Sequence, residues 1–292
     1  MRTFRLILAG LFSASALTAV TLTSSVTADA TTSSSLASCK TTINSQEYTK
    51  GKLTVATDNP VYTPWFVGNK PSNGKGFESA LAYAIAKTLG ISKTNVVWAY
   101  EPFDNSYTPG PKKFDFDINE ISYTAQRATA VTFSESYYDV TQSIVTLKKS
   151  VVEKKHTPAE LKTYLYGDQI GTTGLAYIYN HIHPTQQTRV YSTLDTAVAA
   201  LETGQINAIV VDTPDGQYMA TSQVENAQKK ADGIQVGQFP STGEHYGLLF
   251  KKGNPLVGCV NVAINALKSN GTLASLTNKW LNIYTSVPAI KP

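Results

Sequence analysis

The stretch FDFDINEISYTAQRATAVTF, residues 114–133, combines a strand pattern with a single arginine. Its first five residues alternate strictly between apolar and polar side chains, which predicts a β-strand with one buried face. Arg127 follows among small hydroxyl-bearing residues, between two short apolar segments. Arginine is usually a solvated surface charge. Just past the end of a strand, its planar guanidinium could instead bind an anion such as a carboxylate.

Strand and helix patterns alternate on both sides of this stretch. Residues 52–57 predict a β-branched strand that ends at a turn, and residues 77–90 predict an amphipathic helix. The remaining elements are expected as strands at 95–103, 169–173, 206–212 and 245–253 and as helices at 176–182, 192–204, 254–271 and 272–281. Such alternation predicts mostly parallel sheets covered by helices. Two units of this kind within 292 residues predict two α/β lobes with a cleft between them.

The first residues predict a signal peptide. Arg2 and Arg5 precede the apolar run 6–22, and small residues after it offer a cleavage site. The alternative is a membrane anchor, but the apolar run is short and diluted with Ser and Thr. We therefore expect residues 1–28 to be removed and the protein to be exported to the periplasm, the cell surface or the medium. Residues 29–45 form a low-complexity N-terminal segment.

The chain has two cysteines, Cys39 and Cys259. Residues 36–39, LASC, resemble a bacterial lipobox, which would attach a diacylglycerol to Cys39. A lipobox normally follows the apolar run directly, whereas a Ser/Thr-rich segment intervenes here. An even cysteine count in an exported protein favours a Cys39–Cys259 disulfide. We favour the disulfide, with a lipid-anchored Cys39 as the alternative.

Composition and motifs argue against several functions. The formal net charge is +4 and no run of Lys and Arg is longer than a pair, so nucleic acid is not an expected partner. His181 and His183 could be half of a metal site, but no cysteine or acidic cluster completes it, so we expect no metal. The sequence contains no phosphate-binding loop, Gly-x-Ser-x-Gly elbow or His-Glu-x-x-His motif, so we expect no cofactor and no catalytic residues.

Three predicted strands end in groups suited to a small ligand. Asp58, Tyr62 and Trp65 follow the first strand, Arg127 follows the strand expected at 114–122, and Asp212 ends a third. Ligands of open α/β sheets bind beyond the carboxyl ends of strands. The set supplies a cation, an anion and an aromatic wall, which match the carboxylate, the ammonium group and the side chain of an α-amino acid. The abundant aromatic residues would also suit a carbohydrate, but the charged pair argues against a neutral sugar.

Five blocks of the sequence carry a family resemblance: GKLTVATDNPVYTPWF, GKGFESALAYAIAKTLGI, FDFDINEISYTAQRATAVTFSESYYDVTQSIV, ALETGQINAIVVDTPDGQY and YGLLFKKGNPLVGCVNVAINALKSNGTLASLTNKWL. Together they resemble the family 3 solute-binding proteins of ABC transporters, the polar amino acid receptors, over about residues 51–283. The resemblance implies the type II periplasmic-binding-protein fold, in which two crossing strands join two α/β lobes. Lobe one would comprise 46–139 and 246–285 and lobe two 140–245, and residues 286–292 would form a poorly ordered tail.

The resemblance also implies a binding site whose charged ends lie on opposite lobes. Arg127 matches the arginine that binds the ligand carboxylate, and Asp212 matches the acid that binds the α-ammonium group. Tyr62 and Trp65 would stack on the ligand side chain, and two further residues would line the pocket, Asp58 and Ser122. The disulfide would lie within lobe one and leave closure of the lobes free.

Two positions depart from the family pattern. Glu120 stands where the family has a small or neutral residue, so it favours a cationic or amide ligand unless it faces water. The Gly-Thr-Thr turn of the family would fall near 175–177, but this chain has Gly171-Thr172-Thr173 four residues earlier. We therefore take both Thr173 and Tyr177 as candidate ligand contacts.

The function implied is that of a monomeric binding protein that captures a polar amino acid and delivers it to an ABC-type permease. Two alternatives use the same fold. One is an enzyme similar to cyclohexadienyl dehydratase, with Glu120 as the general acid. The other is a ligand-sensing receptor.

Overall fold

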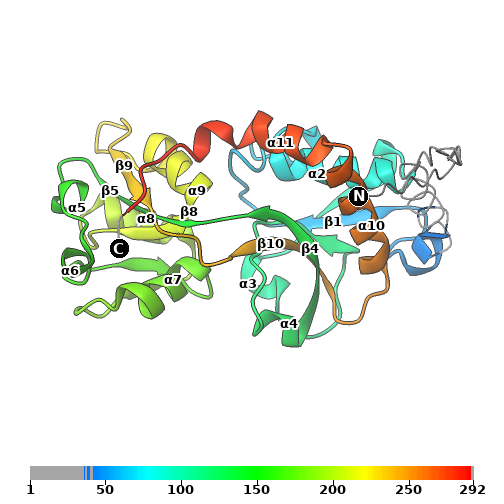
Figure 1. Ribbon diagram of the computed structural model, residues 1–292, viewed down its shortest axis with the longest axis horizontal. Coiled ribbons are helices and arrows are strands. Elements are labelled where there is room, and N and C mark those ends of the chain that lie inside the picture. The colour runs from blue at the N-terminus through cyan, green and yellow to red at the C-terminus, as the bar shows by residue number, and fades with distance from the viewer. Residues whose placement is uncertain (1–35, 37, 40–41, 291–292) are drawn as a thin grey trace, which may run out of the picture.

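The computed structural model describes residue 36, residues 38–39 and residues 42–290, so the predicted signal peptide lies outside the described residues. Two lobes lie side by side along the long axis of the molecule, each built on β-strands with helices packed around them (Figure 1). Within the described part of the chain, none of the helices combines the length and the apolar character needed to cross a bilayer.

The first lobe contains a five-stranded sheet. Its strand order is β2 (Val96–Tyr100), β1 (Leu53–Thr57), β3 (Phe116–Asp117), β10 (His245–Lys251) and β4 (Val131–Asp139). Strand β1 runs parallel to β2 and β3, whereas β10 runs antiparallel to β3 and β4. The helical segments of this lobe include η1 (Pro71–Asn73), α2 (Phe77–Thr88), η2 (Lys93–Asn95), α3 (Phe103–Ser106), α4 (Arg127–Ala130), α10 (Leu256–Ser269) and α11 (Thr272–Trp280).

Helix α2 shows how the sequence pattern becomes packing in this lobe. Its apolar residues recur at steps of four, which places them on one face of a helix. The structure buries that face completely, at Phe77, Leu81 and Ile85, in the core that α2 shares with α10.

The second lobe repeats the strand arrangement of the first. Strands β8 (Ile209–Asp212), β5 (Gln142–Leu147) and β9 (Gly233–Gln238) pair antiparallel, and β6 (Gly167–Gln169) and β7 (Arg189–Tyr191) pair in parallel. A parallel bridge between Tyr166 and Ala208 joins the two groups, so the order reads β7-β6-β8-β5-β9. The helical segments are α5 (Val151–Lys154), α6 (Pro158–Leu161), α7 (Thr173–Tyr177), η3 (Ile178–Ile182), α8 (Leu194–Glu202), α9 (Thr213–Tyr218) and η4 (Met219–Gln223).

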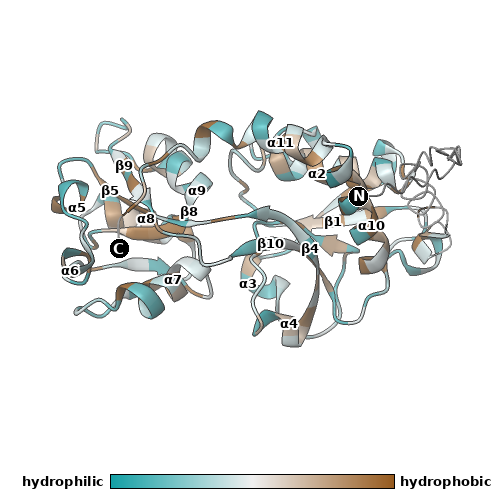
Figure 2. Ribbon diagram, in the orientation of Figure 1, coloured by the Kyte–Doolittle hydropathy of each residue, from teal (hydrophilic) through white to brown (hydrophobic). Residues whose placement is uncertain are grey.

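Two strand connections cross between the lobes. Residues 140–141 join β4 to β5, and residues 239–244 join β9 to β10 (Figure 1). Apolar residues gather in the inner strands of each lobe, for example in β5 and β8, and hydrophilic residues lie on the outer helices (Figure 2). The predicted fold class, two α/β lobes joined by two crossing strands, is confirmed.

Of the tail expected at 286–292, residues 286–290 pack on the second lobe, and residues 291–292 lie outside the described residues. After α11, the short helix η5 (Asn282–Tyr284) packs against α9 of the second lobe, and the chain then runs along β9 (Figure 1). The backbone N–H of Gln238 donates to the carbonyl of Pro288 at 2.8 Å, and that of Ile290 donates to the carbonyl of Gln238 at 2.7 Å. Ile290 is buried in the core of the second lobe, and this apolar anchor explains the order.

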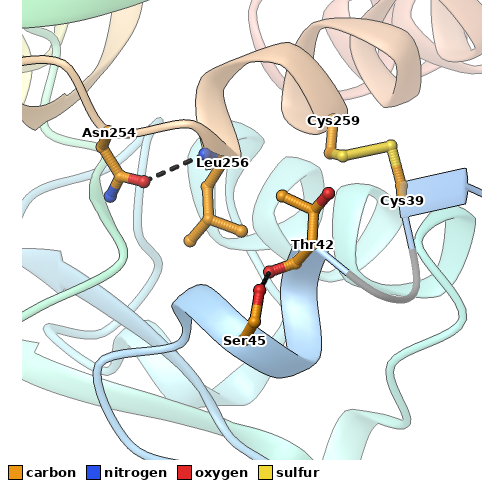
Figure 3. The surroundings of a disulfide bond; sticks show 6 residues. All are labelled: Cys39, Thr42, Ser45, Asn254, Leu256 and Cys259. Carbon is orange, nitrogen blue, oxygen red and sulfur yellow. Dashed lines mark hydrogen bonds between the residues drawn. A yellow bond between two sulfur atoms is a disulfide. The ribbon is translucent and has the colours of Figure 1, made fainter.

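The predicted disulfide is confirmed. Cys39 is bonded to Cys259 on α10, and both residues are buried at the edge of the first-lobe core (Figure 3). A sulfur atom in a disulfide cannot also form the thioether of a lipid anchor, so the structure speaks for the disulfide at Cys39. The bond ties the N-terminal segment to the first lobe.

We predict that the double substitution Cys39→Ser with Cys259→Ser lowers the free energy of unfolding. The bond joins residues 220 positions apart, for which chain entropy gives an upper value of about 5 kcal/mol. Thermal unfolding followed by circular dichroism, with and without a reductant, tests this. Reductant should lower the Tm of the native protein and leave the Tm of the double variant unchanged. The same native Tm with and without reductant would contradict the prediction.

Candidate functional site

A cavity of about 140 Å³ lies between the lobes, at the carboxyl ends of strands from both sheets. Six of the nine residues predicted from the sequence line it: Asp58, Tyr62, Glu120, Arg127, Thr173 and Asp212. Asp58 follows β1, Glu120 follows β3 and Asp212 ends β8, so the strand ends bring these side chains together. A cavity of this size suits a small molecule and not a macromolecule.

Arg127 is the first residue of α4 and lies almost fully buried, with 7% of its surface exposed. Its guanidinium donates to the carbonyl of Ser122 at 2.7 Å and, across the cleft, to the carbonyl of Gly171 at 2.9 Å. The ring of Tyr107 lies 4.6 Å from the guanidinium carbon and that of Phe103 lies 5.3 Å from it. Burial lowers the pKa of Arg127, but a guanidinium stays charged in proteins.

The charge of Arg127 has no counter-charge in contact with it. Among the described residues, no carboxylate lies within salt-bridge distance of this side chain. The two carbonyls and two rings that contact the guanidinium orient it and are themselves neutral, whereas the carboxyl groups of Asp212 and Glu244 act on its charge without contacting it. A buried cation of this kind has a strong preference for an anion.

Asp212 provides the opposite charge on the second lobe. Its carboxylate accepts hydrogen bonds from the side-chain amide of Gln142 and from the hydroxyl of Tyr246, which belongs to β10 of the first lobe. Burial raises the pKa of Asp212, and the nearby carboxylate of Glu244 raises it further. The side chain therefore gains from a cation that lies against it.

Glu120 and Asp215 form a contact between two carboxyl groups across the cleft. Glu120 has a positive φ of 54°, and its backbone N–H donates to Glu78 of α2 at 2.8 Å. Its side chain is hydrogen-bonded to that of Asp215, near the start of α9, which also accepts from the indole N–H of Trp65 at 2.5 Å. Burial raises the pKa of both carboxyl groups. Glu120 therefore faces the cavity and not the solvent outside it.

The two predicted aromatic residues have different surroundings. Tyr62 lines the cavity, and its hydroxyl donates to both oxygens of Asp195 on the second lobe, at 2.8 and 2.9 Å. Trp65 has no exposed surface and packs edge-on against Phe77, Tyr138 and Tyr246 in the first-lobe core, so it does not line the cavity. Phe103, which the sequence reading missed, lines the cavity on the same lobe.

Ser122 acts on the cavity indirectly. It is buried, its hydroxyl donates to Glu244 at 2.6 Å, and its carbonyl holds Arg127. Ser122 therefore orients the arginine from behind instead of lining the cavity.

Of the two candidate contacts in α7, Thr173 lines the cavity between the lobes and Tyr177 does not. Thr173 opens α7 and lines the cavity together with Thr172, whose hydroxyl caps the helix by accepting from the N–H of Leu175. Tyr177 lies at the end of the same helix and stacks on Phe239, with ring centroids 4.6 Å apart, beside a different cavity. The turn 171–173 of this chain thus reaches the cleft itself, without the four-residue displacement expected from the ungapped match.

Acidic residues outnumber basic ones on the cavity wall. Its lining contains the five carboxyl groups of Asp58, Glu120, Asp168, Asp212 and Asp215 and the single guanidinium of Arg127. The sequence reading missed Asp168 and Asp215. Asp168 lies in the middle of β6, one residue before the strand expected at 169–173, and the Oδ2 atom of its buried carboxyl group has no hydrogen-bond partner.

The comparison with known protein families identifies the chain. Residues 53–283 match the bacterial extracellular solute-binding proteins, family 3. The chain belongs to this family. The match covers both lobes and both crossing connections, so all the cavity-lining residues named above lie within it.

Relatives with similar sequences are solute-binding proteins of bacteria. The arginine-binding periplasmic protein of Mannheimia haemolytica is 26% identical over 230 residues, which are 76% of this chain and 88% of that protein. The ABC transporter arginine-binding protein 1 of Escherichia coli K12 is 29% identical over 210 residues, 70% of this chain and 81% of that protein.

Solved structures of the same fold include two proteins described as ancestral. An ancestral arginine-binding protein bound to glutamine has a TM-score of 0.64 and 28% identity, over 80% of this chain and 98% of the other. An ancestral amino acid-binding protein described as a precursor of cyclohexadienyl dehydratase has a TM-score of 0.64 and 26% identity, over 79% and 95%.

The buried acids of this family member predict a pH dependence of its stability. Burial raises the pKa of Asp117, at the end of β3, from 3.8 to about 7. Between these values the folded protein holds a proton that the unfolded chain has lost, so the contribution of Asp117 to stability falls as the pH rises towards 7 and is constant above it.

Asp117→Asn should flatten this dependence. We expect the native protein to lose about 2–3 kcal/mol more than the variant between about pH 5 and pH 8. Denaturant unfolding at both pH values measures the difference, with the exposed Asp104→Asn as the matched control. Parallel pH profiles for the native protein and Asp117→Asn would show that the carboxyl ionises normally.

Proposed function

We propose that this protein binds a cationic α-amino acid between its lobes and delivers it to the permease of an ABC transporter. One observation carries the proposal: Arg127, a buried cation without a contacting carboxylate, lines the same cavity as Asp212 of the opposite lobe. The ligand carboxylate would pair with Arg127 and the α-ammonium group with Asp212. Tyr62 and Phe103 would cover the aliphatic stem.

The positive side chain follows from the charge of the cavity. One acid is used by the α-ammonium group and the one guanidinium by the carboxylate, which leaves four further carboxyl groups on the wall: Asp58, Glu120, Asp168 and Asp215. A cationic side chain would reduce the repulsion among them, whereas an acidic one would add to it. Several similar proteins are named as arginine-binding, which agrees with this choice.

Closure of the cleft would couple binding to delivery. We propose that residues 46–139 with 246–285 move as one body and residues 140–245 as the other. A ligand that bridges Arg127 and Asp212 finds both partners only when the lobes are together, so it favours the closed form. Each charge-assisted contact would contribute roughly 1.5–3 kcal/mol.

Location and assembly complete the proposal. Signal-peptide cleavage would release the chain outside the cytoplasm, where it would act as a monomer because the two lobes of one chain form the whole cavity. We propose binding without chemical turnover, in agreement with the solute-binding relatives. Incubation with prephenate checks this: consumption of prephenate would support the dehydratase alternative, with Glu120 as its acid.

A thermal-shift screen of the twenty amino acids tests the ligand class. Arginine, lysine or histidine should raise the Tm, because a ligand at a hundred times its Kd adds about 2.7 kcal/mol to the free energy of unfolding. Aspartate and glutamate should leave the Tm unchanged. A shift with the acidic amino acids alone would overturn the charge argument.

Substitution of the two charged residues tests the site. Arg127→Ala and Asp212→Asn should each weaken binding about 10- to 150-fold, since each removes one charge-assisted contact. Arg127→Lys should also bind weakly, because an ammonium group lacks the bidentate geometry, and it guards against loss of folding in the alanine variant. Arg189→Ala, on exposed β7, is the control. Native affinity in both Arg127→Ala and Asp212→Asn would refute the site.

A further inference from the structure

Glu120 and Asp215 place two carboxyl groups in contact, one from each lobe. Glu120 follows β3 of the first lobe, and Asp215 belongs to α9 of the second. Both line the cavity in which we propose that the ligand binds. Asp215 also accepts a hydrogen bond from the indole N–H of Trp65, which is buried in the first-lobe core, and the backbone N–H of Glu120 donates to Glu78. Each carboxyl group of the pair is therefore positioned by a further hydrogen bond to its own residue.

The groups around this pair are acidic or neutral. Glu78 faces Glu120 from α2 and Asp212 faces it from β8, and both raise its pKa together with Asp215. Asp117 of β3 lies close enough to raise the pKa of Glu78. The hydroxyls of Tyr137 on β4 and Tyr246 on β10 donate to Glu78 and Asp212 and not to the pair.

Among the described residues, no ion pair joins Arg127 to Glu120 or Asp215. The carboxyl groups that stabilise the charge of this arginine, and so raise its pKa, are those of Asp212 and Glu244. Two carboxyl groups in hydrogen-bond contact cannot both carry a full negative charge, so one proton must lie between them or a cation must take its place.

We propose that Glu120 and Asp215 share one proton when the lobes are in contact, and that a cationic amino acid displaces this proton when it binds. The inference rests on the proposed function and extends it to Asp215 and to the proton. The exchange is balanced: the protein takes up the ligand cation and releases one H⁺ to the buffer, while the pair changes from a carboxylic acid and a carboxylate to two carboxylates. Glu120 and Asp215 thereby determine specificity for a positive charge.

The exchange gives binding a defined pH dependence. While the pair holds its proton, the affinity for a cationic ligand should rise about tenfold for each pH unit, because each binding event releases one proton. Once the pair has lost the proton, the affinity should become independent of pH. The interaction between the two carboxyl groups also changes from attractive to repulsive as the pH rises. With neither a shared proton nor a ligand cation, the two carboxylates repel each other and oppose contact between the lobes.

Calorimetric titration of the protein with L-arginine tests the exchange directly. Titrations at about pH 6, in two buffers with different ionisation enthalpies, give the number of protons released for each ligand bound. We expect close to one proton for the native protein and none for Glu120→Gln, whose amide donates to Asp215 permanently. Asp215→Asn should also release none. Both variants should bind more weakly and lose the pH dependence. Glu135→Gln, an exposed position of β4, should behave as the native protein does.

The outcomes separate the inference from the proposed function. Binding with equal heats in the two buffers would overturn the proton exchange and leave the proposed function intact. Proton release that persists in Glu120→Gln and Asp215→Asn would also overturn it, because another group would then be the source. Failure of every amino acid to bind would overturn both. Loss of proton release in the two variants with binding retained supports the inference.

Discussion

A buried guanidinium without a counter-charge is the constraint on which the rest of the site depends. Arg127 is held by a carbonyl from each lobe and by two aromatic rings, and these fix its position without neutralising it. The cost of removing a charge from water is large unless an anion joins it. The described residues supply no carboxylate in contact with Arg127, and in our proposal the carboxylate of the ligand takes this place.

The acidic residues of the cavity raise a second problem, the repulsion among buried carboxyl groups. They outnumber the arginine, and burial raises the pKa of several of them because the charged form loses its hydration. The protein manages the repulsion with hydroxyl, amide and indole donors placed on Asp212 and Asp215. These donors come partly from the opposite lobe, so the same contacts that stabilise the acids also bring the lobes together. The stabilisation of the buried acids and the contact between the lobes therefore depend on the same hydrogen bonds.

Three chain segments connect the lobes, and they differ in kind. The two crossings between β4 and β5 and between β9 and β10 continue strands from one sheet into the other. The third is the C-terminal segment, which leaves α11 and pairs with β9 through Gln238. It lies on the second lobe because Ile290 finds an apolar core there. The disulfide, by contrast, acts within the first lobe and does not cross the cleft.

The sequence by itself determined the two-lobe α/β fold and predicted the two charged ends of the site. It did not determine the limits of every strand, since the strand expected at 169–173 is β6, Gly167–Gln169. Local periodicity and turn residues specify strands and helices, and the carboxyl ends of strands are where α/β sheets bind ligands, so Arg127, Asp212 and Asp58 could be named from spacing and resemblance. The even cysteine count was likewise enough to predict the disulfide.

Only the tertiary structure decided which neighbours in sequence face the cavity and which face the core. Trp65 lies three residues after Tyr62 yet points into the first lobe, and Tyr177 lies one helical turn after Thr173 yet packs on Phe239. The pairing of Glu120 with Asp215 joins elements 95 positions apart on different lobes. Side-chain direction and cross-lobe contact arise when the elements pack, and no local pattern encodes them, because the free energy that selects them comes from burial shared between distant segments.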